Sequence, residues 1–424
     1  MNHGHLRILT SEREYVFPVP DKNRPRNEHD NLRAEFKVLS GSFWIRLALM
    51  SDLGFAEAFM YGDVQCEDLV SVFQIFIKNR KSLADMSTSL SWLASLPQTL
   101  TQYRFLNTIS NSRSNISAHY DISNQMFAGF LSEDMTYSCG IFSDLDADLH
   151  HHNKIDDLYD AQMRKIHHII RKADIRPGHR VLEIGSGWGA LAIEAVRLTG
   201  CEVDTLTLSV AQKVLAEERI AAAGPEFAQK IRVHLMDYRA MPEEWQGTFD
   251  RFVSVEMIEA VGREFLEGYW TIVDWALKKE NAMGVVQVIT IPEAIDFIRK
   301  WIFPGGFLPT VNFLVETLTK GSSGSLIVES ISNIGPHYAR TLREWRRRFE
   351  AKFDEVIVPA LQSEYPDVMG PQTGLKGLRE IEVFKRKWIC DCYCEVGFTT
   401  RTLGDHIMTF TREGNSSFGC DVYE

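Results

Sequence analysis

The 424-residue sequence contains no apolar run long enough to cross a bilayer, for which a helix needs about 20 residues. Its first residues, MNHGHLRILTSEREY, also lack the continuous apolar stretch of a secretory signal peptide. We therefore expect a cytoplasmic protein without a membrane span. The seven cysteines are an odd number in a long chain without such a signal, which favours reduced thiols over a disulfide framework.

An excess of positive charge is also missing. The 46 Lys and Arg residues are outnumbered by 57 Asp and Glu residues, which gives a net charge of -11. Because general nucleic-acid binding requires a basic face that neutralises phosphates, this balance argues against such a function. Apolar residues at 45% and charged residues at 24% are typical of a globular protein with one large core or two smaller ones.

Two groups of potential metal ligands lack the spacing of a metal site. Cys390, Cys392 and Cys394 alternate, so in a strand their side chains would share one face, but they do not form the CxxC pair of zinc sites. We interpret them as small core residues. The adjacent histidines 150–152 cannot all point at one ion, so a solvated loop is favoured. We expect no metal centre.

The pattern of the chain divides it into two parts. Residues 1–110 mix short apolar runs with polar connections, and helical spacing is evident at 69–77, so we expect an N-terminal accessory domain there. The polar segment 110–117 (SNSRSNIS) predicts an exposed connection. We expect a second, larger domain over 111–424.

From about residue 155 onward, helical periodicity alternates with short apolar runs. The expected strands are 180–184, 203–208, 231–235, 249–255 and 284–291, and the expected helices are 158–173, 190–198, 211–223 and 269–277. Such alternation predicts an α/β fold, in which an open, mostly parallel and doubly wound sheet carries helices on both faces.

The most informative motif is 183–189, EIGSGWG, which directly follows the first expected strand and precedes a helix. Its E-x-G-x-G-x-G spacing differs from the G-x-G-x-x-G dinucleotide fingerprint. Gly185 and Gly187 let the backbone approach a ligand closely, and the N–H groups at the start of the helix face that ligand. The carboxylate of Glu183 suits a cationic ligand better than a pyrophosphate.

The next two expected strands also end in polar residues. Thr207 and Gln212 follow one of them, and Asp237 and Tyr238 follow the other. Taken singly, each is more often a helix cap or a surface group. Because the carboxyl ends of parallel strands meet at one edge of a sheet, together they predict a ligand crevice. Thr207 and Gln212 would bind the ribose and methionyl groups of a nucleoside cofactor, with Asp237 and Tyr238 at its adenine end.

Several separate segments occur in the order found in one family: YSC (137–139), EIGSGWG (183–189), EMIEAVG (256–262), FPGG and LP (303–306 and 308–309), and HY with a later Trp (337–338 and 345). Over about 119–400 the sequence resembles the cyclopropane fatty acid synthase family, and 54–63 (GFAEAFMYGD) resembles its N-terminal region. EMIEAVG and IFPGG are closer to plant and fungal members. The resemblance implies a seven-stranded class I methyltransferase core, S-adenosylmethionine bound with the help of Tyr137 and Ser138, and an insertion at about 293–319 over an acyl pocket.

The resemblance also implies a reaction. An alkene carbon of an unsaturated phospholipid acyl chain attacks the sulfonium methyl group, and proton loss from the new methyl group of the resulting cation closes a cyclopropane ring. The cation needs a dry pocket, aromatic faces and a base. The implied base is a bound bicarbonate ion, held by Cys139, Glu259, Tyr338 and the backbone near Ile289. Gln287 stands where bacterial members have a histidine, and its amide can donate to an oxyanion but cannot carry a proton.

The acyl chain itself would lie in an apolar tunnel. The candidates are Trp301, Phe303, Phe307, Leu308 and Phe313. Because this substrate sits in a membrane, we expect peripheral membrane association. A basic cluster, Arg343 and Arg346–Arg348, either contacts anionic head groups or forms a solvated helix face, and both interpretations stay open. The oligomeric state also stays open, a homodimer included.

Two other functions remain open. A methyltransferase of the same fold could give a methyl-branched lipid or methylate an amine, although the full set of Cys139, Glu259 and Tyr338 argues against an amine acceptor. A lipid-binding or cofactor-sensing module without catalysis is disfavoured by the intact GSGWG motif. We interpret Cys139 as a thiol that lines the site, because no His or Lys near it in the sequence would activate it as a nucleophile.

Overall fold

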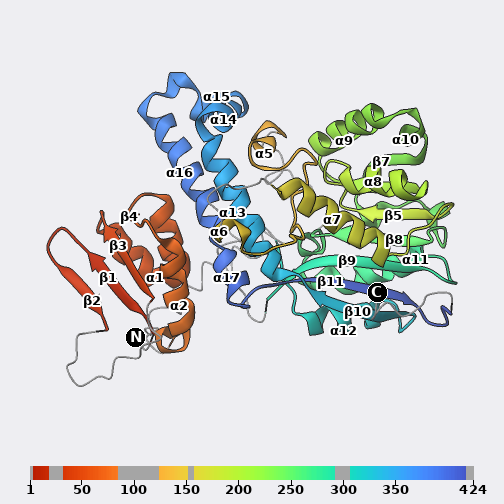
Figure 1. The fold of residues 1–424 in the computed structure, drawn as a ribbon, viewed down its shortest axis with the longest axis horizontal. Helices are drawn as coiled ribbons and strands as arrows, with labels where there is room; N and C mark the ends of the chain where they lie inside the picture. The colour runs from red at the N-terminus through yellow and green to blue at the C-terminus, as the bar shows by residue number, and fades with distance from the viewer. Residues whose placement is uncertain (1–2, 19–31, 85–123, 151–156, 292–305, 417–424) are drawn as a thin grey trace.

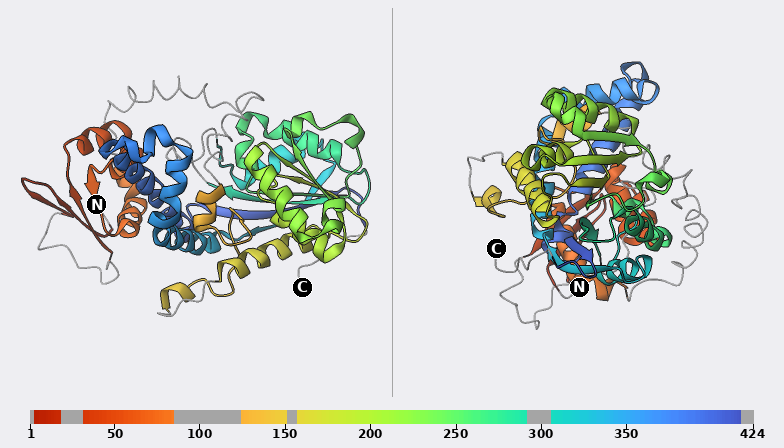
Figure 2. Two further views of the ribbon diagram at one scale, coloured as in Figure 1. Left: turned by 90° about the horizontal axis from the view of Figure 1, so that it is seen from above. Right: turned by 90° about the vertical axis from the view of Figure 1, so that its right-hand side faces the viewer.

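The computed structural model describes residues 3–18, 32–84, 124–150, 157–291 and 306–416. These residues build a seven-stranded sheet in the order β10-β11-β9-β8-β5-β6-β7 and a four-stranded sheet in the order β2-β1-β3-β4 (Figure 1). Figure 2, seen from above, places the two sheets at opposite ends of the molecule with long helices between them. No helix in the described ranges is long and apolar enough to span a bilayer.

The larger sheet is mostly parallel. Its strands are β5 (Arg180–Ile184), β6 (Glu202–Thr207), β7 (Ile231–Leu235), β8 (Arg251–Val255), β9 (Met283–Thr290), β10 (Leu326–Asn333) and β11 (Gly404–Arg412). The strands β5 to β9 run parallel to their neighbours, whereas β11 runs antiparallel to both β9 and β10. This confirms the predicted doubly wound α/β core.

Helices cover both faces of this sheet, as its apolar strands require. Successive residues of β5 belong to different cores: Val181 is part of the core that includes residues of α7, α8, α9 and α13, whereas Leu182 is part of the core that includes residues of α11 and α12. These helices are α7 (Leu158–Lys172), α8 (Ala190–Thr199), α9 (Val210–Ala223), α11 (Leu266–Ala276), α12 (Val311–Gly321) and α13 (Gly335–Ala351). Short helices α5 (Asn124–Phe130), α6 (Ala147–His150) and α10 (Pro225–Lys230) accompany them. Each expected strand and helix of this core is present, with shifts of a few residues at the ends.

The N-terminal part forms its own small core. It comprises β1 (His5–Leu9), β2 (Glu14–Phe17), β3 (Arg33–Val38), α1 (Ser42–Met60), β4 (Val64–Gln65) and α2 (Leu69–Ala84). The helical spacing predicted at 69–77 is therefore confirmed. The predicted connection at 110–117 and the domain boundary at 110 lie outside the described residues, as do His151 and His152.

A helical excursion between β10 and β11 joins the two parts. After α13 it continues through a π-helical turn (Phe353–Ile357), α14 (Val358–Glu364), α15 (Pro366–Met369), α16 (Leu375–Cys392) and α17 (Glu395–Thr399). Of the three alternating cysteines, Cys390 and Cys392 lie at the end of α16, so they are not part of a strand. Both are buried, and Cys390 packs into the N-terminal core, as a small core residue would.

Candidate active site

The sheet reverses its strand order at β5, which has β6 on one side and β8 on the other. In open α/β sheets a crevice forms at this point, outside the carboxyl ends of the strands. One pocket occupies it here, and its lining includes every residue predicted to bind the cofactor: Tyr137, Ser138, Glu183, Gly185, Gly187, Thr207, Gln212, Asp237 and Tyr238. We call it the cofactor pocket.

The glycines of the 183–189 turn serve different purposes. Gly185 has a φ of +100°, and a Cβ there would lie 3.0 Å from Cβ of Met257, so the turn approaches the β8 end closely. Gly187 also has a positive φ, +48°, but a Cβ there would meet no described atom within 4 Å. Because Gly187 lines the pocket, a side chain at this position would occupy the space where the ligand belongs.

Glu183 brings a buried carboxylate to the pocket wall. It is 3% exposed, and its Oε2 has no hydrogen-bond partner among the described residues. Burial raises the pKa of this carboxyl to about 8, despite the opposing influence of the Thr205 hydroxyl and of the Lys165 ammonium group. A buried acceptor without a partner at a pocket wall fits a ligand that brings positive charge and hydrogen-bond donors, as S-adenosylmethionine does.

The polar side chains that follow β6 and β7 are hydrogen-bonded to neighbouring side chains. The Thr207 hydroxyl donates to Oε1 of Gln212 at 2.9 Å. Asp237 accepts from Nε and Nη2 of Arg239 at 2.8 and 2.6 Å, and the Arg239 guanidinium lies 5.4 Å from the Tyr238 ring centroid. Arg239 lines the pocket too, and the sequence interpretation missed it.

Lys165 is a second missed residue of the pocket. It is 1% exposed on the inner face of α7, and its Nζ donates to the Ser138 hydroxyl at 2.6 Å. Burial lowers the pKa of its ammonium group. The sequence could have revealed this residue, because helical periodicity places Lys165 on the same buried face of α7 as Leu158, Ile166 and Ile169.

Next to the pocket, three acids form what we call the carboxylate cluster: Glu256, which is partly buried, and Glu259 and Asp405, which are buried. Glu256 is its centre. Its Oε1 accepts from the Cys139 N–H and from Nε2 of Gln287, both at 2.8 Å, and its Oε2 accepts from the Tyr338 hydroxyl at 2.7 Å. Glu256 also lines the cofactor pocket.

The backbone at Glu256 is strained. Its φ is +47°, in the left-handed region that residues with a side chain rarely adopt. Such a conformation costs on the order of 1–3 kcal/mol and clusters at functional sites. The three hydrogen bonds to the side chain, together with that from the Glu256 N–H to the Gln287 carbonyl at 2.8 Å, hold the residue in this conformation.

The other acids complete the cluster. Glu259 Oε1 accepts from the Ile289 N–H at 2.6 Å, and Asp405 Oδ2 accepts from Nε2 of Gln287 at 2.8 Å. The structure thus brings together all five predicted catalytic residues, Cys139, Glu259, Gln287, Ile289 and Tyr338, but with a different pairing. Tyr338 contacts Glu256 and not Glu259. Glu256 and Asp405 were missed by the sequence interpretation.

Burial dominates the acid–base properties of the cluster. It raises the pKa of Glu256, raises that of Glu259 to about 8, and raises that of Asp405 well above the usual range, with like charges adding to the last two. Burial also raises the pKa of the Cys139 thiol well above its ordinary value. Cys139 is therefore a neutral thiol, in agreement with its interpretation as a residue that lines the site.

These contacts do not fit a bicarbonate ion beside Glu256. The ion was expected to be held by Cys139, Glu259, Tyr338 and the backbone near Ile289, with the Gln287 amide as a further donor. The donors at these positions, namely the Cys139 and Ile289 N–H groups, the Gln287 amide and the Tyr338 hydroxyl, already donate to carboxylates of the chain, whereas Glu259 Oε2 is a buried acceptor without a partner among the described residues. A further anion would have to replace those bonds and lie next to buried acids, which like-charge repulsion disfavours.

The predicted acyl tunnel is described only in part. Trp301 and Phe303 lie outside the described residues. Phe307 and Phe313 form an edge-to-face pair with centroids 5.7 Å apart, and Leu308 packs against the core that contains α7. The Phe307 N–H donates to the Glu259 carbonyl at 2.8 Å, which ties this apolar segment to the carboxylate cluster. The tunnel itself stays a prediction.

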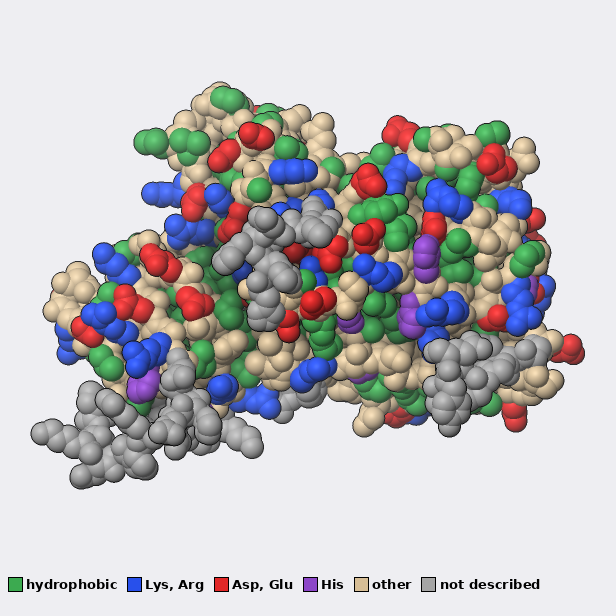
Figure 3. All heavy atoms as spheres, in the orientation of Figure 1, with side chains coloured by type: hydrophobic (Ala, Val, Ile, Leu, Met, Phe, Trp, Pro, Cys, Tyr) green, Lys and Arg blue, Asp and Glu red, His purple; other side chains and the backbone are tan. Residues whose placement is uncertain are grey.

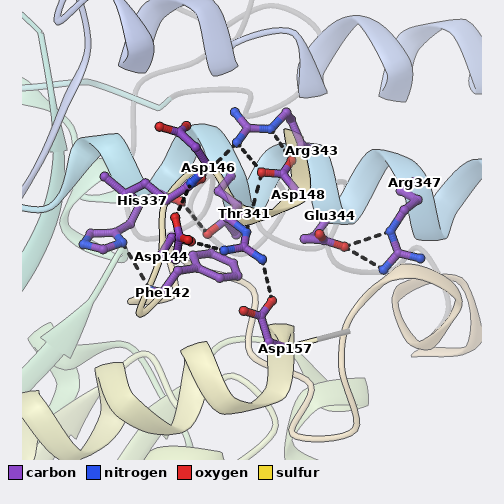
Figure 4. A network of polar contacts seen from close by, with 12 residues as sticks. Phe142, Asp144, Asp146, Asp148, Asp157, His337, Thr341, Arg343, Glu344 and Arg347 are labelled. Carbon is purple, nitrogen blue, oxygen red and sulfur yellow. Dashed lines mark hydrogen bonds and ion pairs between the residues drawn. The ribbon is translucent and has the colours of Figure 1, made fainter. Parts of the chain in front are cut away.

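The arginine side chains of the basic cluster on α13 interact with other groups of the protein. Arg343 donates to both carboxylate oxygens of Asp148, at 2.6 and 2.9 Å, and Arg347 pairs with Glu344 (Figure 4). Arg346 lies over the Tyr393 ring, and Arg348 donates to the Leu131 carbonyl. Lys and Arg side chains on the face shown in Figure 3 are interspersed with acidic ones. These arginines therefore do not form a free basic face, and membrane contact stays a prediction.

Comparisons with known proteins agree with this geometry. The family described as mycolic acid cyclopropane synthetase matches residues 107–366. A tuberculostearic acid methyltransferase of Mycobacterium tuberculosis is 36% identical over 85% of this chain and 79% of its own length. The cyclopropane-fatty-acyl-phospholipid synthase of Escherichia coli is 30% identical over 76% and 78%, respectively.

Solved structures share the fold. A cyclopropane synthase of Mycobacterium tuberculosis superposes with a TM-score of 0.57 at 23% identity, covering 71% of this chain and 98% of that one. Coclaurine N-methyltransferase superposes with a TM-score of 0.62 at 18% identity, covering 84% and 98%. The family match spans more than half of the chain and includes the cofactor pocket together with Glu256 and Glu259 of the carboxylate cluster, whereas Asp405 lies beyond it. The chain therefore belongs to the mycolic acid cyclopropane synthetase family and is a methyltransferase that depends on S-adenosylmethionine.

Proposed function

We propose that this enzyme transfers the methyl group of S-adenosylmethionine to the double bond of an unsaturated fatty acyl chain of a phospholipid. The observation that carries the proposal is the position of Glu256, which lines the cofactor pocket and is also the centre of the carboxylate cluster. A methyl group delivered from this pocket would therefore arrive next to a proton-accepting site. Simple methyl transfer to an amine that releases its own proton would not need such a buried site.

The pocket residues would bind and orient the cofactor. S-adenosylmethionine supplies an electrophilic methyl group on a positively charged sulfur. The backbone at Gly187 leaves room for close approach, and the buried carboxylate of Glu183 favours a cationic ligand. Thr207 and Gln212 would bind its ribose and methionyl groups, and Asp237 and Tyr238 its adenine end. Tyr137, which stacks on Trp345 with centroids 4.9 Å apart, adds an aromatic face that tolerates a cation.

Around the reacting carbons, the chain excludes water. Cys139 and Gln287 are fully buried, and Tyr338 is 6% exposed. A carbocation formed by methyl transfer would persist long enough to lose a proton only in such a site. The apolar segment with Phe307, Leu308 and Phe313 would receive the acyl chain.

Two products are compatible with this site. Proton loss from the new methyl group with ring closure gives a cyclopropane, the product named for the 30% identical relative. A methyl-branched lipid is the second candidate, because the 36% identical relative is named a tuberculostearic acid methyltransferase. Both products begin with the same methyl transfer.

The test is to incubate the purified enzyme with S-adenosylmethionine labelled in its methyl group and vesicles of unsaturated phospholipid. We expect label in the acyl chain, at the position of the former double bond. Mass spectrometry combined with proton NMR would distinguish a cyclopropane from a methyl branch. Saturated phospholipid vesicles serve as the control. Label that appears equally with saturated lipid, or only on an added amine, would contradict the proposal.

A further inference from the structure

Glu256 occupies the place in the site that an external anion was expected to fill. Its carboxylate accepts hydrogen bonds from the Cys139 backbone, the Gln287 amide and the Tyr338 hydroxyl, at 2.7–2.8 Å. The donors come from residues 117, 31 and 82 positions away in the sequence. Convergence of donors from three distant segments is the arrangement that binds an oxyanion. Here the oxyanion is part of the chain.

The residue that carries this carboxylate also lines the pocket where the chemistry would occur. Glu256 is only partly buried, and it lines the cofactor pocket together with Tyr137, Ser138 and Met257. Glu259, by contrast, is 6% exposed and holds the Ile289 backbone. Of the three acids in the carboxylate cluster, Glu256 is the one that lines this pocket.

We propose that Glu256 is the proton acceptor of the reaction and that this enzyme needs no bicarbonate. The inference rests on the proposed methyl transfer to an alkene. The π electrons of the alkene form a bond to the methyl carbon as the carbon–sulfur bond electrons return to sulfur, which leaves S-adenosylhomocysteine and a carbocation. A proton of the new methyl group then passes to Glu256, and the electrons of that C–H bond close the ring. Glu256 ends as a neutral carboxylic acid.

The surroundings keep Glu256 ready to accept a proton. Its three donors favour the ionised form. The Gln287 amide also donates to Asp405, which is fully buried and whose pKa is raised well above the usual range by burial. The Lys165 ammonium group further favours the anion at Glu256, while burial keeps its pKa above that of an exposed carboxyl, which makes it a stronger base.

Two variants of Glu256 separate this role from a structural one. Glu256→Gln keeps the size of the side chain and removes the base. Glu256→Gly removes the side chain, suits the φ of +47°, and leaves the Cys139, Gln287 and Tyr338 donors free for an added anion. Glu267→Gln, at an exposed glutamate on α11, is the matched control. Each protein is assayed at constant pH in buffer stripped of carbon dioxide and again with added bicarbonate.

We expect the parent and the Glu267→Gln variant to turn over at the same rate in both buffers. Glu256→Gln should lose about 10²–10⁴-fold in turnover, as is typical for a positioned base, with its affinity for S-adenosylmethionine retained. Glu256→Gly should be slow in stripped buffer and recover on addition of bicarbonate. A parent enzyme that loses activity without bicarbonate, or a Glu256→Gln variant at the parental rate, would overturn the inference.

A binding measurement keeps the inference testable if the proposed substrate is wrong. Carbon-13-labelled bicarbonate is added to the parent and to Glu256→Gly, each saturated with S-adenosylhomocysteine, and bound ion is detected by NMR. We expect binding to the variant and none to the parent. Bicarbonate bound by the parent would overturn the inference, whereas absence of any lipid methylation would overturn only the proposed function.

Discussion

The cofactor pocket and the carboxylate cluster lie side by side, but their polar groups differ in how far they are hydrogen-bonded within the protein. In the pocket, Glu183 Oε2 has no partner among the described residues, and Gly187 faces open space. In the cluster, the backbone, amide and hydroxyl donors already donate to Glu256 and Glu259, although the buried acceptors Glu259 Oε2 and Asp405 Oδ1 have no partner among the described residues. The pocket is thus shaped to receive a ligand, whereas the cluster is assembled in advance around an anion of its own. Preorganisation of this kind avoids reorganisation at the moment of reaction.

The largest effect should come from closing the pocket while leaving the cluster intact. In Gly187→Val a branched side chain would fill the space beside the turn, at a φ of +48° that valine rarely adopts. We expect calorimetry to detect no binding of S-adenosylmethionine. Gly178→Val is the matched control, because Gly178 also has a positive φ and open space around it but does not line the pocket. Parental affinity in Gly187→Val would show that the ligand lies elsewhere.

The cluster should be broken by freeing α13, the helix that carries Tyr338. Asp148, 7% exposed, pairs with Arg343, and Arg340 Nε lies 3.8 Å from the same carboxylate, which fixes α13 to the segment that follows Cys139 (Figure 4). Asp148→Ala removes the carboxylate partner of Arg343, while Arg340 keeps its ion pair with Asp157, and should cost about 3–5 kcal/mol in the free energy of unfolding. Chemical denaturation measures this. Glu316→Gln, which removes an exposed pair with Lys320, should change stability little. A similar small change in Asp148→Ala would mean that the network does not hold the helix.

A milder change within the cluster should leave the pocket untouched. Tyr338→Phe removes one hydrogen bond to the Glu256 carboxylate, and such bonds to charged groups contribute about 1.5–3 kcal/mol, or roughly 10–100-fold in rate. Because that bond lowers the pKa of Glu256, its loss should also move the acid limb of the pH–rate profile to higher pH. Steady-state kinetics across pH measures both effects. An unchanged pH–rate profile would show that the Tyr338 hydroxyl does not influence the pKa of the catalytic base.

The smallest effect sharpens the description of the pocket. The Glu183 carboxyl has a pKa of about 8 in the free protein, so it holds a proton at neutral pH, and a cationic ligand favours its ionised form. Binding of S-adenosylmethionine should therefore release a proton and weaken as pH falls below about 8, by at most about tenfold per pH unit. Calorimetry in buffers of different ionisation enthalpy counts this proton. Glu183→Gln should abolish its release, and a release that persists would assign the proton to another group, such as Glu259.

The two sites also differ in how far the sequence could reveal them. The pocket residues stand directly after strands, in short motifs such as 183–189, and their positions follow once the parallel sheet is predicted. Lys165 could have been found from the helical periodicity of α7. The cluster depends on contacts that no local pattern records: Asp405 lies on an antiparallel strand, 118 residues beyond Gln287.

The choice between neighbouring carboxylates could not be made from the sequence either. Glu256 and Glu259 lie in the same motif, and only the left-handed backbone at Glu256 turns its side chain toward Tyr338. The alternation of Cys390, Cys392 and Cys394 did not reveal their secondary structure, because three residues are too few to distinguish a strand from the end of a helix.

The most direct test of the central claim follows the methyl group itself. S-adenosylmethionine with a fully deuterated methyl group is supplied to the parent enzyme with unsaturated phospholipid vesicles, and the mass of the modified acyl chain is measured. If a base beside the pocket removes a proton from the transferred methyl group, the product will have lost one deuterium of that group. A product that keeps every deuterium would show that no proton leaves the methyl group, and would contradict the account of Glu256 as its acceptor.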